Sequence, residues 1–349
     1  MTAALALDNS ETTLGPRVEA TPYGPGKGLP VFITPRDARL RDDQDAALAW
    51  LAEQREALEA LITDVGGIVL RGFPFPDTAA FNRVIEPFPD VPFGYSGGAT
   101  TRGQIAGRAF EATRAPQDFR IMLHQEMAYL PNFPSRLAFF CAHAPAAGGE
   151  TIIADVRRFE AAVDPAFVRT VHERGVKYVR NFRSPDWTPP HPTLVPLHKT
   201  WRDAFFTDDP RKAEADCLAM GLEFEWTVNG SLSVIYAASG FTNHPREGRE
   251  IWFNHIASQT MSDYNYGADR IALFREHYGD HTPWSYQTFF ADGGRIPLED
   301  VEGLYPILEE VTVAFPWRAG DVMILDNIYS FHGRNAFTGT RDVQVALLG

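Results

Sequence analysis

Residues 310–348 read EVTVAFPWRAGDVMILDNIYSFHGRNAFTGTRDVQVALL, and this stretch decides the fold class. EVTVAFPW (310–317) alternates apolar and polar residues, which predicts a half-buried strand. RAGD (318–321) is typical of a turn, and VMILDN (322–327) and DVQVALL (342–348) are predicted to be short apolar strands. Short strands in close succession favour an antiparallel barrel or jelly roll.

The remaining chain adds more short strands and several helices. Strands are predicted at 67–73, 119–124, 137–142, 151–155 and 176–182, and helices at 43–66, 77–88, 164–175, 209–221 and 262–279. Asp77 is the expected N-cap of the second helix. Because strands and helices do not alternate regularly, the sequence predicts a mainly β fold with helical padding.

The domain organisation follows from composition along the chain. Residues 1–30 are rich in Gly, Pro and Thr, which predicts an extended N-terminal arm. Residues 31–349 are expected to form one domain. Five prolines within 184–200 exclude a regular element there, and an insertion or lid is expected around 184–290.

Charge and cysteine content exclude several classes of function. The chain has 349 residues and a net charge of −13, which disfavours binding to nucleic acid. Cys141 and Cys217 lie in apolar or helical contexts, as reduced thiols of a cytoplasmic protein do. The N-terminus lacks a basic signal-peptide region, and no run of 18 apolar residues occurs, so we expect neither secretion nor a membrane span.

The first candidate functional residues lie in IMLHQEMAYLPNFPS (121–135), where His124 and Glu126 are two positions apart. Residues i and i+2 of a strand face the same way, so the two side chains would lie next to each other. A carboxylate in such apolar surroundings is costly unless it is paired or bound to a metal. Taken alone, this short motif is more often structural than functional.

His332 and Arg341, near the C-terminus, change that interpretation. His332 follows the apolar strand VMILDN closely, and Gly333 permits a close approach of backbone. Arg341 at the start of DVQVALL needs an anionic partner, which a small-molecule carboxylate could supply. Two histidines and one carboxylate suit non-haem Fe(II). A zinc site with the same ligands is the alternative, but it would leave Arg341 unexplained.

At this point the chain resembles a known family. Its motifs, in order, are GIVLRGF, YSGGATTRG, the H-Q-E of IMLHQEMAYLPNFPSRLAFFC, GGETIIADVR, GVKYVRNF, IWFN, FPWRAGDVMILDN and HGRNAFTGTR. They resemble the Fe(II)/2-oxoglutarate-dependent oxygenases related to taurine dioxygenase and clavaminate synthase. The nearest likeness is to hydroxylases of syringomycin-type nonribosomal peptide pathways. The resemblance extends from about residue 65 to the C-terminus.

The resemblance implies a distorted double-stranded β-helix, which is a jelly roll. It implies that His124, Glu126 and His332 bind Fe(II), that Arg341 and Thr151 bind 2-oxoglutarate, and that O₂ is the second co-substrate. Related halogenases carry Ala or Gly at the carboxylate position. The presence of Glu126 therefore implies a hydroxylase rather than a halogenase, with release of succinate and CO₂.

The substrate is less defined by the sequence. Some relatives carry a second arginine where this chain has Val345, and syringomycin-type members often carry a charged segment where residues 232–236 read LSVIY, so we do not expect a strongly acidic substrate. Candidate substrate contacts are Arg102, Asn254 and Arg334.

Three classes of small-molecule substrate stay open: a free amino acid, an amino acid tethered to a carrier protein, and a natural-product intermediate. Desaturation or cyclisation at the same iron site is one alternative activity. A zinc-dependent hydrolase and a non-catalytic binding module on the barrel are alternatives from other classes.

Overall fold

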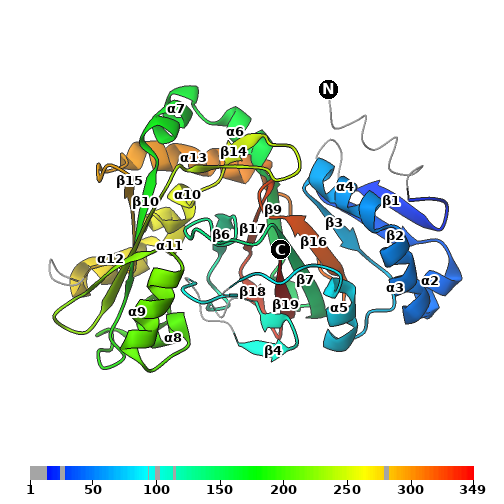
Figure 1. Cartoon of the computed structure of the whole chain (residues 1–349), viewed down its shortest axis with the longest axis horizontal. Helices are drawn as coiled ribbons and strands as arrows, with labels where there is room; N and C mark the ends of the chain where they lie inside the picture. The colour runs from blue at the N-terminus through cyan, green and yellow to red at the C-terminus, as the bar shows by residue number, and fades with distance from the viewer. Residues whose placement is uncertain (1–13, 24–27, 93, 99–102, 113–114, 279–282) are drawn as a thin grey trace.

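The structure is a computed structural model that describes residues 14–23, 28–92, 94–98, 103–112, 115–278 and 283–349. Within these ranges the largest sheet has eight strands (Figure 1). In spatial order they are β1 (Val18–Pro22), β2 (Val31–Pro35), β3 (Gly67–Leu70), β16 (Val322–Asp326), β7 (Arg136–His143), β19 (Asp342–Leu348), β5 (Ala109–Glu111) and β4 (Gln104–Ala106). Neighbours pair antiparallel except β2 and β3, which are parallel.

The two faces of this sheet bury different partners. On β7, Ala138 and Phe140 point to one face and Leu137, Phe139 and Cys141 to the other. The first face packs against α3 (Gln44–Glu53), α4 (Arg55–Val65) and α5 (Thr78–Ile85), drawn in blue to cyan in Figure 1 beside the short helix α2 (Ala38–Asp42). The second face belongs to the larger core, which surrounds the interior of the fold.

A smaller sheet lies across that interior from the main sheet. Its order is β6 (Ile121–His124), β17 (Ser330–Arg334) and β9 (Thr151–Asp155), all antiparallel. Phe139 of β7 and His332 of β17 pack with ring centroids 5.4 Å apart, so the two sheets face each other. Over the described residues the sheets do not close into a barrel. The prediction of a distorted jelly roll with helical padding is confirmed.

The remaining elements lie mainly on the other side of this interior from α2–α5 (Figure 1). A third sheet has four strands, in the order β11 (Glu223–Trp226), β12 (Leu232–Ala238), β10 (Val176–Phe182) and β15 (Tyr286–Phe290). Two small pairs are β13 (Phe241–Asn243) with β14 (Glu250–Trp252), and β8 (Ala147–Gly148) with β18 (Phe337–Thr338). The helices are α6 (Val156–Ala162), α7 (Pro165–Arg174), η1 (Pro192–Leu197), α8 (Trp201–Phe205), α9 (Pro210–Ala219), α10 (Ile256–Gln259), α11 (Asp263–Tyr266), α12 (Ala268–His277) and α13 (Leu298–Val311).

Several local predictions can be compared with these elements. Asp77 caps α5 as expected, since its carboxylate accepts a hydrogen bond of 2.9 Å from the backbone N–H of Ala80. The single helix predicted at 43–66 is two helices that meet at Gln54. Residues 18–22 of the predicted N-terminal arm form β1 and pair with β2.

The strand predicted at 310–317 is wrong. Helix α13 extends into this stretch, because Leu304, Leu308 and Val311 continue a buried helical face. Only Val313 makes a sheet-like bridge, to Ile153 of β9. Of the two valines in EVTVAF, Val311 therefore belongs to helix α13 and Val313 forms the isolated bridge.

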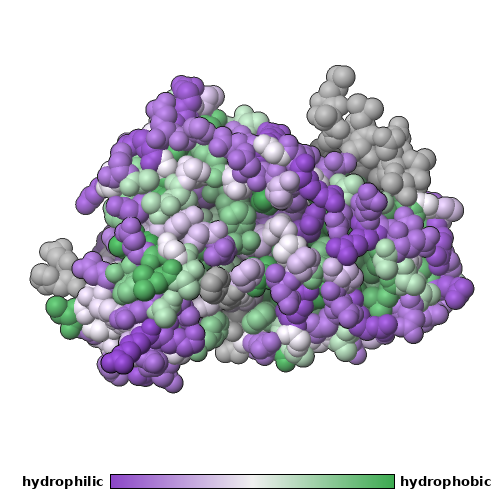
Figure 2. Space-filling model, in the orientation of Figure 1, coloured by the Kyte–Doolittle hydropathy of each residue, from purple (hydrophilic) through white to green (hydrophobic). Residues whose placement is uncertain are grey.

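The surface is predominantly hydrophilic on the face shown in Figure 2, with hydrophobic residues in separate patches. Among the described residues, no helix has the length and apolar character needed to cross a membrane.

Candidate active site

The predicted metal ligands converge between the two facing sheets. One ligand atom from each of His124, Glu126 and His332 lies within 4.8 Å of the others. A carboxylate oxygen of Glu126 is 3.3 Å from Nε2 of His332, and the two imidazole rings have centroids 4.3 Å apart. His124 and His332 are direct partners in the antiparallel pairing of β6 and β17. The cluster is therefore built on a cross-strand pair, with the carboxylate added from the residues that follow β6.

His124 is prepared for metal binding by its second nitrogen. Nδ1 lies 2.8 Å from the backbone carbonyl of Met122, a distance that requires Nδ1 to carry the hydrogen and donate it. Nε2 is then left with its lone pair. Burial, together with the nearby imidazole of His332, holds the pKa of His124 well below its usual range. A neutral imidazole with a free Nε2 is the form that binds a metal ion.

Glu126 is held through its backbone by Asn327, the residue after β16. The fully buried Asn327 side chain accepts a hydrogen bond of 2.7 Å from the Glu126 N–H and donates one of 3.0 Å to its carbonyl. It also donates to the carbonyl of Pro134 at 2.8 Å. Met127, which follows Glu126, has a φ of 61°, a backbone conformation that is unfavourable for a residue with a side chain of this size. Asn327 thus fixes an unfavourable turn that points the carboxylate at the histidines.

The turn from β16 to β17 is fixed by Asp326. One oxygen of this buried carboxylate accepts hydrogen bonds of 3.0 Å from the N–H groups of Ile328 and Tyr329. The other lies 3.0 Å from Nε2 of His244. Because this turn leads into β17, these contacts set the position from which His332 projects.

Gly333 has the role that the sequence suggested. A Cβ atom at this position would lie 2.5 Å from the carbonyl oxygen of Ile121. Only glycine therefore lets β6 approach β17 closely enough for His124 and His332 to meet.

A narrow cavity beside the cluster contains the predicted 2-oxoglutarate residues. Its wall includes His124, His332, Thr151, Arg334 and Arg341. The Arg341 guanidinium donates from Nε to the carbonyl of Gly149 at 2.9 Å and lies 3.5 Å from the Thr151 hydroxyl. The Trp317 indole N–H also donates to that hydroxyl, at 3.2 Å.

The charge in this cavity fits an anionic ligand. In the described part of the chain, Arg341 forms no ion pair with a carboxylate. Burial, with a smaller contribution from Arg334, lowers the pKa of Arg341 to about 10, and burial lowers the pKa of Arg334 to about 10. Arg341 is a largely buried cation with a lowered pKa, and a bound anion compensates such a charge best. Two histidines, one carboxylate and this cationic cavity therefore fit Fe(II) with 2-oxoglutarate.

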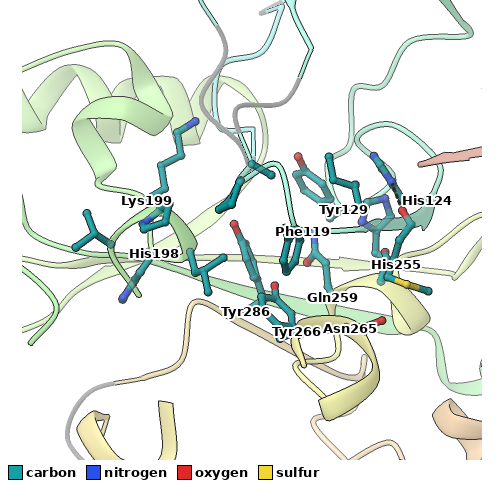
Figure 3. Close-up of a pocket in the computed structure, with 18 of the residues that line it drawn as sticks. Phe119, His124, Tyr129, His198, Lys199, His255, Gln259, Asn265, Tyr266 and Tyr286 are labelled. Carbon is teal, nitrogen blue, oxygen red and sulfur yellow. Dashed lines mark hydrogen bonds between the residues drawn. The ribbon is translucent and has the colours of Figure 1, made fainter. Parts of the chain in front are cut away.

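A larger cavity of about 330 Å³ also borders the cluster. His124, Glu126 and His255 lie at its metal end, and Arg183, His198, Lys199 and Asp203 also line it. Figure 3 shows Phe119 and Tyr286 between His124 and the distant pair of His198 and Lys199. Phe119, Ile121, Met122, Val195, Pro196 and Leu197 contribute apolar wall. Such a cavity, apolar with a few polar groups, is typical of a small-molecule site.

The three predicted substrate contacts have different positions. The Asn254 amide donates to the carbonyl of Gly240 at 2.9 Å and accepts from the N–H of Ile256, so it fixes the start of α10. Arg334 donates to the carbonyls of Pro116 and Phe119, and its side chain lines the narrow cavity. Arg102 lies outside the described residues. The role of all three as substrate contacts stays a prediction.

Sequence reasoning did not identify several residues around the cluster. Asn327 and Asp326 had been assigned only to an apolar strand, and nothing in the sequence pointed from them to Glu126. His255 is buried in the wall of the larger cavity, with its ring centroid 5.6 Å from that of His124. Burial lowers the pKa of His255 to about 4, so this imidazole is neutral. Its proximity to His124 depends on folding, because the two lie far apart in the chain.

Comparison with known proteins agrees with this geometry. Residues 29–347 match the family model described as taurine catabolism dioxygenase TauD, TfdA family. A clavaminate synthase-like protein of Arabidopsis thaliana is 32% identical over 299 residues, covering 84% of each chain. The dapdiamide synthesis protein DdaC of Enterobacter agglomerans is 28% identical over 291 residues, covering 83% of this chain and 84% of DdaC.

Solved structures show the same fold. PvcB from Pseudomonas aeruginosa, an Fe, alpha-ketoglutarate dependent oxygenase from an isonitrile synthetic pathway, has a TM-score of 0.52 at 17% identity, covering 95% of this chain and 92% of PvcB. An asparagine oxygenase solved with Fe(II), 3-hydroxyasparagine and succinate has a TM-score of 0.51 at 14% identity, covering 99% and 91%. The chain belongs to the TauD/TfdA dioxygenase family, and the Fe(II), 2-oxoglutarate and O₂ expected from its sequence are the cofactor and co-substrates of that family.

Proposed function

We propose that this protein is an Fe(II)- and 2-oxoglutarate-dependent hydroxylase of an unactivated C–H bond. The substrate is an amino acid, an amino acid tethered to a carrier protein, or a natural-product intermediate. Ligands carried on His124, Glu126 and His332 would hold the iron, and Arg341 with Thr151 would hold the far carboxylate of 2-oxoglutarate.

One observation carries this proposal: the ligand cluster lies where two cavities meet. His124 lines both the narrow cationic cavity and the larger cavity, His332 lines the first, and Glu126 lines the second. Two different small molecules can therefore reach the metal position from two cavities. An oxygenase that couples a co-substrate to a separate substrate needs this arrangement.

The protein's own residues supply binding, orientation and exclusion of water. When bound together, Fe(II), 2-oxoglutarate and O₂ supply an oxidation of the substrate that releases succinate and CO₂. Arg341 offers a planar fork that matches a carboxylate with two hydrogen bonds. Asn327, which holds the backbone of Glu126, keeps the carboxylate in place. Phe139 closes the cluster toward the main sheet.

Glu126 also favours hydroxylation over halogenation. Its carboxylate is within 3.3 Å of His332, so it can act as a third protein ligand. A halide would need the coordination position that this carboxylate takes. The product formed in chloride-containing buffer should therefore gain oxygen and no chlorine, which mass spectrometry of the product determines. Desaturation or cyclisation at the same site would give a product with no added oxygen.

Anaerobic titration separates the oxygenase from the two alternatives of other classes. Fe(II) plus 2-oxoglutarate should produce a weak absorption band in the visible range. Hydrolysis supported by Zn(II) alone, without such a band, would instead identify a zinc-dependent hydrolase. Binding of the small molecule without any succinate release after O₂ is admitted would indicate a non-catalytic module.

Glu126→Ala tests the ligand assignment. This variant should lose substrate oxidation, because only two protein ligands remain. Glu309→Ala is the matched control, since it removes a carboxylate that pairs with Arg120 at the surface. Full activity in Glu126→Ala would show that Glu126 is not a ligand.

A further inference from the structure

The larger cavity contains a buried amide whose hydrogen-bonding groups are not used. Gln259, the last residue of α10, is 4% exposed, and neither Oε1 nor Nε2 has a hydrogen-bond partner among the described residues. Figure 3 shows its side chain beside His255 and Asn265 and on the side of the cavity near His124. A buried amide without partners destabilises the protein, because its polar groups have lost their hydrogen bonds to water. A ligand that pairs with it would offset this cost.

Asn265 in α11 provides a second unused group next to the first. Its Nδ2 donates to the carbonyls of Ala257 and Thr260, both at 2.6 Å. These contacts settle the orientation of the amide, so Oδ1 is the free end, and it is buried with no partner among the described residues. Since Ala257 and Thr260 lie on either side of Gln259 in the chain, the two amides are neighbours in the cavity wall.

Together these groups define which ligand would be satisfied. Gln259 offers a donor NH₂ and an acceptor oxygen, and Asn265 offers a second acceptor. A primary carboxamide is the complement, because its oxygen accepts from Gln259 Nε2 while its two hydrogens donate to Gln259 Oε1 and Asn265 Oδ1. An ester lacks both hydrogens, and an ionised carboxylate lacks any donor.

The charges of the cavity do not favour an ammonium group at this position. Its acidic lining residues within the described part of the chain are Glu126, which belongs to the metal cluster, and Asp203. Asp203 already accepts a hydrogen bond of 2.6 Å from the Thr200 hydroxyl, and its charge acts on the guanidinium of Arg183. A neutral group is therefore the better fit beside Gln259.

We propose that Gln259 and Asn265 form a specificity subsite that binds a primary carboxamide of the substrate next to the metal. This inference rests on the proposed function, since the carboxamide belongs to the molecule that is oxidised. It narrows the three substrate classes to members that carry a –CONH₂ group.

Matched probes test the subsite. For several carbon skeletons that fit the cavity, the primary carboxamide, the N-methylamide, the carboxylate and the methyl ester are compared as stimulators of succinate release by the Fe(II) protein. L-Glutamine, L-glutamate and glutamate γ-methyl ester form one such series. Primary carboxamides should stimulate release about 10- to 100-fold more than their matched acids and esters, the range expected for two to three hydrogen bonds in a buried site. If no carboxamide exceeds its matched acid and ester, the subsite is wrong.

Two variants give a readout that a structural role would not. Gln259→Leu should remove the preference for carboxamides over esters. Gln259→Glu should reverse the ranking toward probes that carry an ammonium group in place of the carboxamide. Gln344→Leu is the matched control, because Gln344 is also a buried glutamine with an unpaired Oε1 but lies in β19 outside this cavity, and it should keep the wild-type preference. An unchanged preference in both Gln259 variants would also overturn the inference.

The same experiments separate this inference from the proposed function. The subsite alone is refuted if the visible band forms with Fe(II) and 2-oxoglutarate, but succinate release is the same with carboxamide probes as with their matched acids and esters. Absence of both the band and any succinate release refutes the oxygenase, and the subsite with it.

Discussion

Replacing Asn327 by alanine should uncouple the metal ligand Glu126 from the rest of the fold. The variant loses three hydrogen bonds, to the N–H and carbonyl of Glu126 and to the carbonyl of Pro134. At about 1 kcal/mol each, these contribute about 3 kcal/mol. Because Asn327 is fully buried, the groups left behind have no access to water. The loss in free energy of unfolding should therefore reach about 3 to 5 kcal/mol.

The same change should weaken metal binding, because residues that orient metal ligands typically contribute 10- to 100-fold in affinity. Urea unfolding in the presence of a chelator measures the stability of the metal-free protein. Anaerobic calorimetric titration with Fe(II) then measures the affinity under conditions in which the variant is folded.

Asn181→Ala is the matched control for this variant. Asn181 is also buried and makes a similar set of contacts, with the carbonyl of Trp284, the amide of Gln287 and the hydroxyl of Ser233. It should lose similar stability while keeping its metal affinity within about threefold, since it touches no ligand. Equal metal affinities in the two variants, or a stability loss below about 1 kcal/mol in Asn327→Ala, would refute the reasoning.

Three further predictions concern other parts of the site. Arg341→Met should weaken 2-oxoglutarate binding by about 2 to 5 kcal/mol, measured by titration of the visible band. The control Arg71→Met loses an ion pair with a buried aspartate and should bind 2-oxoglutarate as the wild type does. Wild-type binding in the Arg341 variant would reject Arg341 as the anchor. Burial lowers the pKa of His198 to about 4, below the value of about 6.5 in an unfolded chain, so the folded protein binds fewer protons between these pH values. Stability is then full above pH 6.5 and is lost as pH falls, by about 2 kcal/mol between pH 7 and pH 5, and His198→Gln should remove that part of the slope in urea unfolding. Gly333→Ala should destabilise the protein by about 1 to 3 kcal/mol, because the added Cβ clashes with β6. Gly303→Ala, in open space on α13, should stabilise it by about 0.5 to 1 kcal/mol. A higher melting temperature for Gly333→Ala than for Gly303→Ala would contradict this prediction.

The sequence predicted those parts of the fold in which local pattern and tertiary packing agree. The strands of VMILDN and DVQVALL are buried on both faces of the central sheet and read as apolar runs. EVTVAFPW misled because a period of two can arise by chance where a helix ends. Its first valine completes the buried face of α13, a context that lies upstream of the quoted stretch.

For the site, sequence reasoning succeeded where chemistry restricts residue type. Imidazole, carboxylate and guanidinium side chains in apolar stretches are few in this sequence. His124, Glu126, His332 and Arg341 could therefore be grouped by the ligands that they bind. Asn327 and Gln259 could not be found in this way, because asparagine and glutamine are common and their roles depend on which buried groups they meet. Only the folded chain shows that Asn327 faces Glu126 and that Gln259 faces a cavity.

The pairing of His124 with His332 also has a consequence for how the protein folds. The two strands that carry them are separated by some two hundred residues, so closing this contact requires ordering a very long loop. We therefore expect the metal to bind after β6 and β17 have paired, so that it stabilises the folded chain rather than starting its folding.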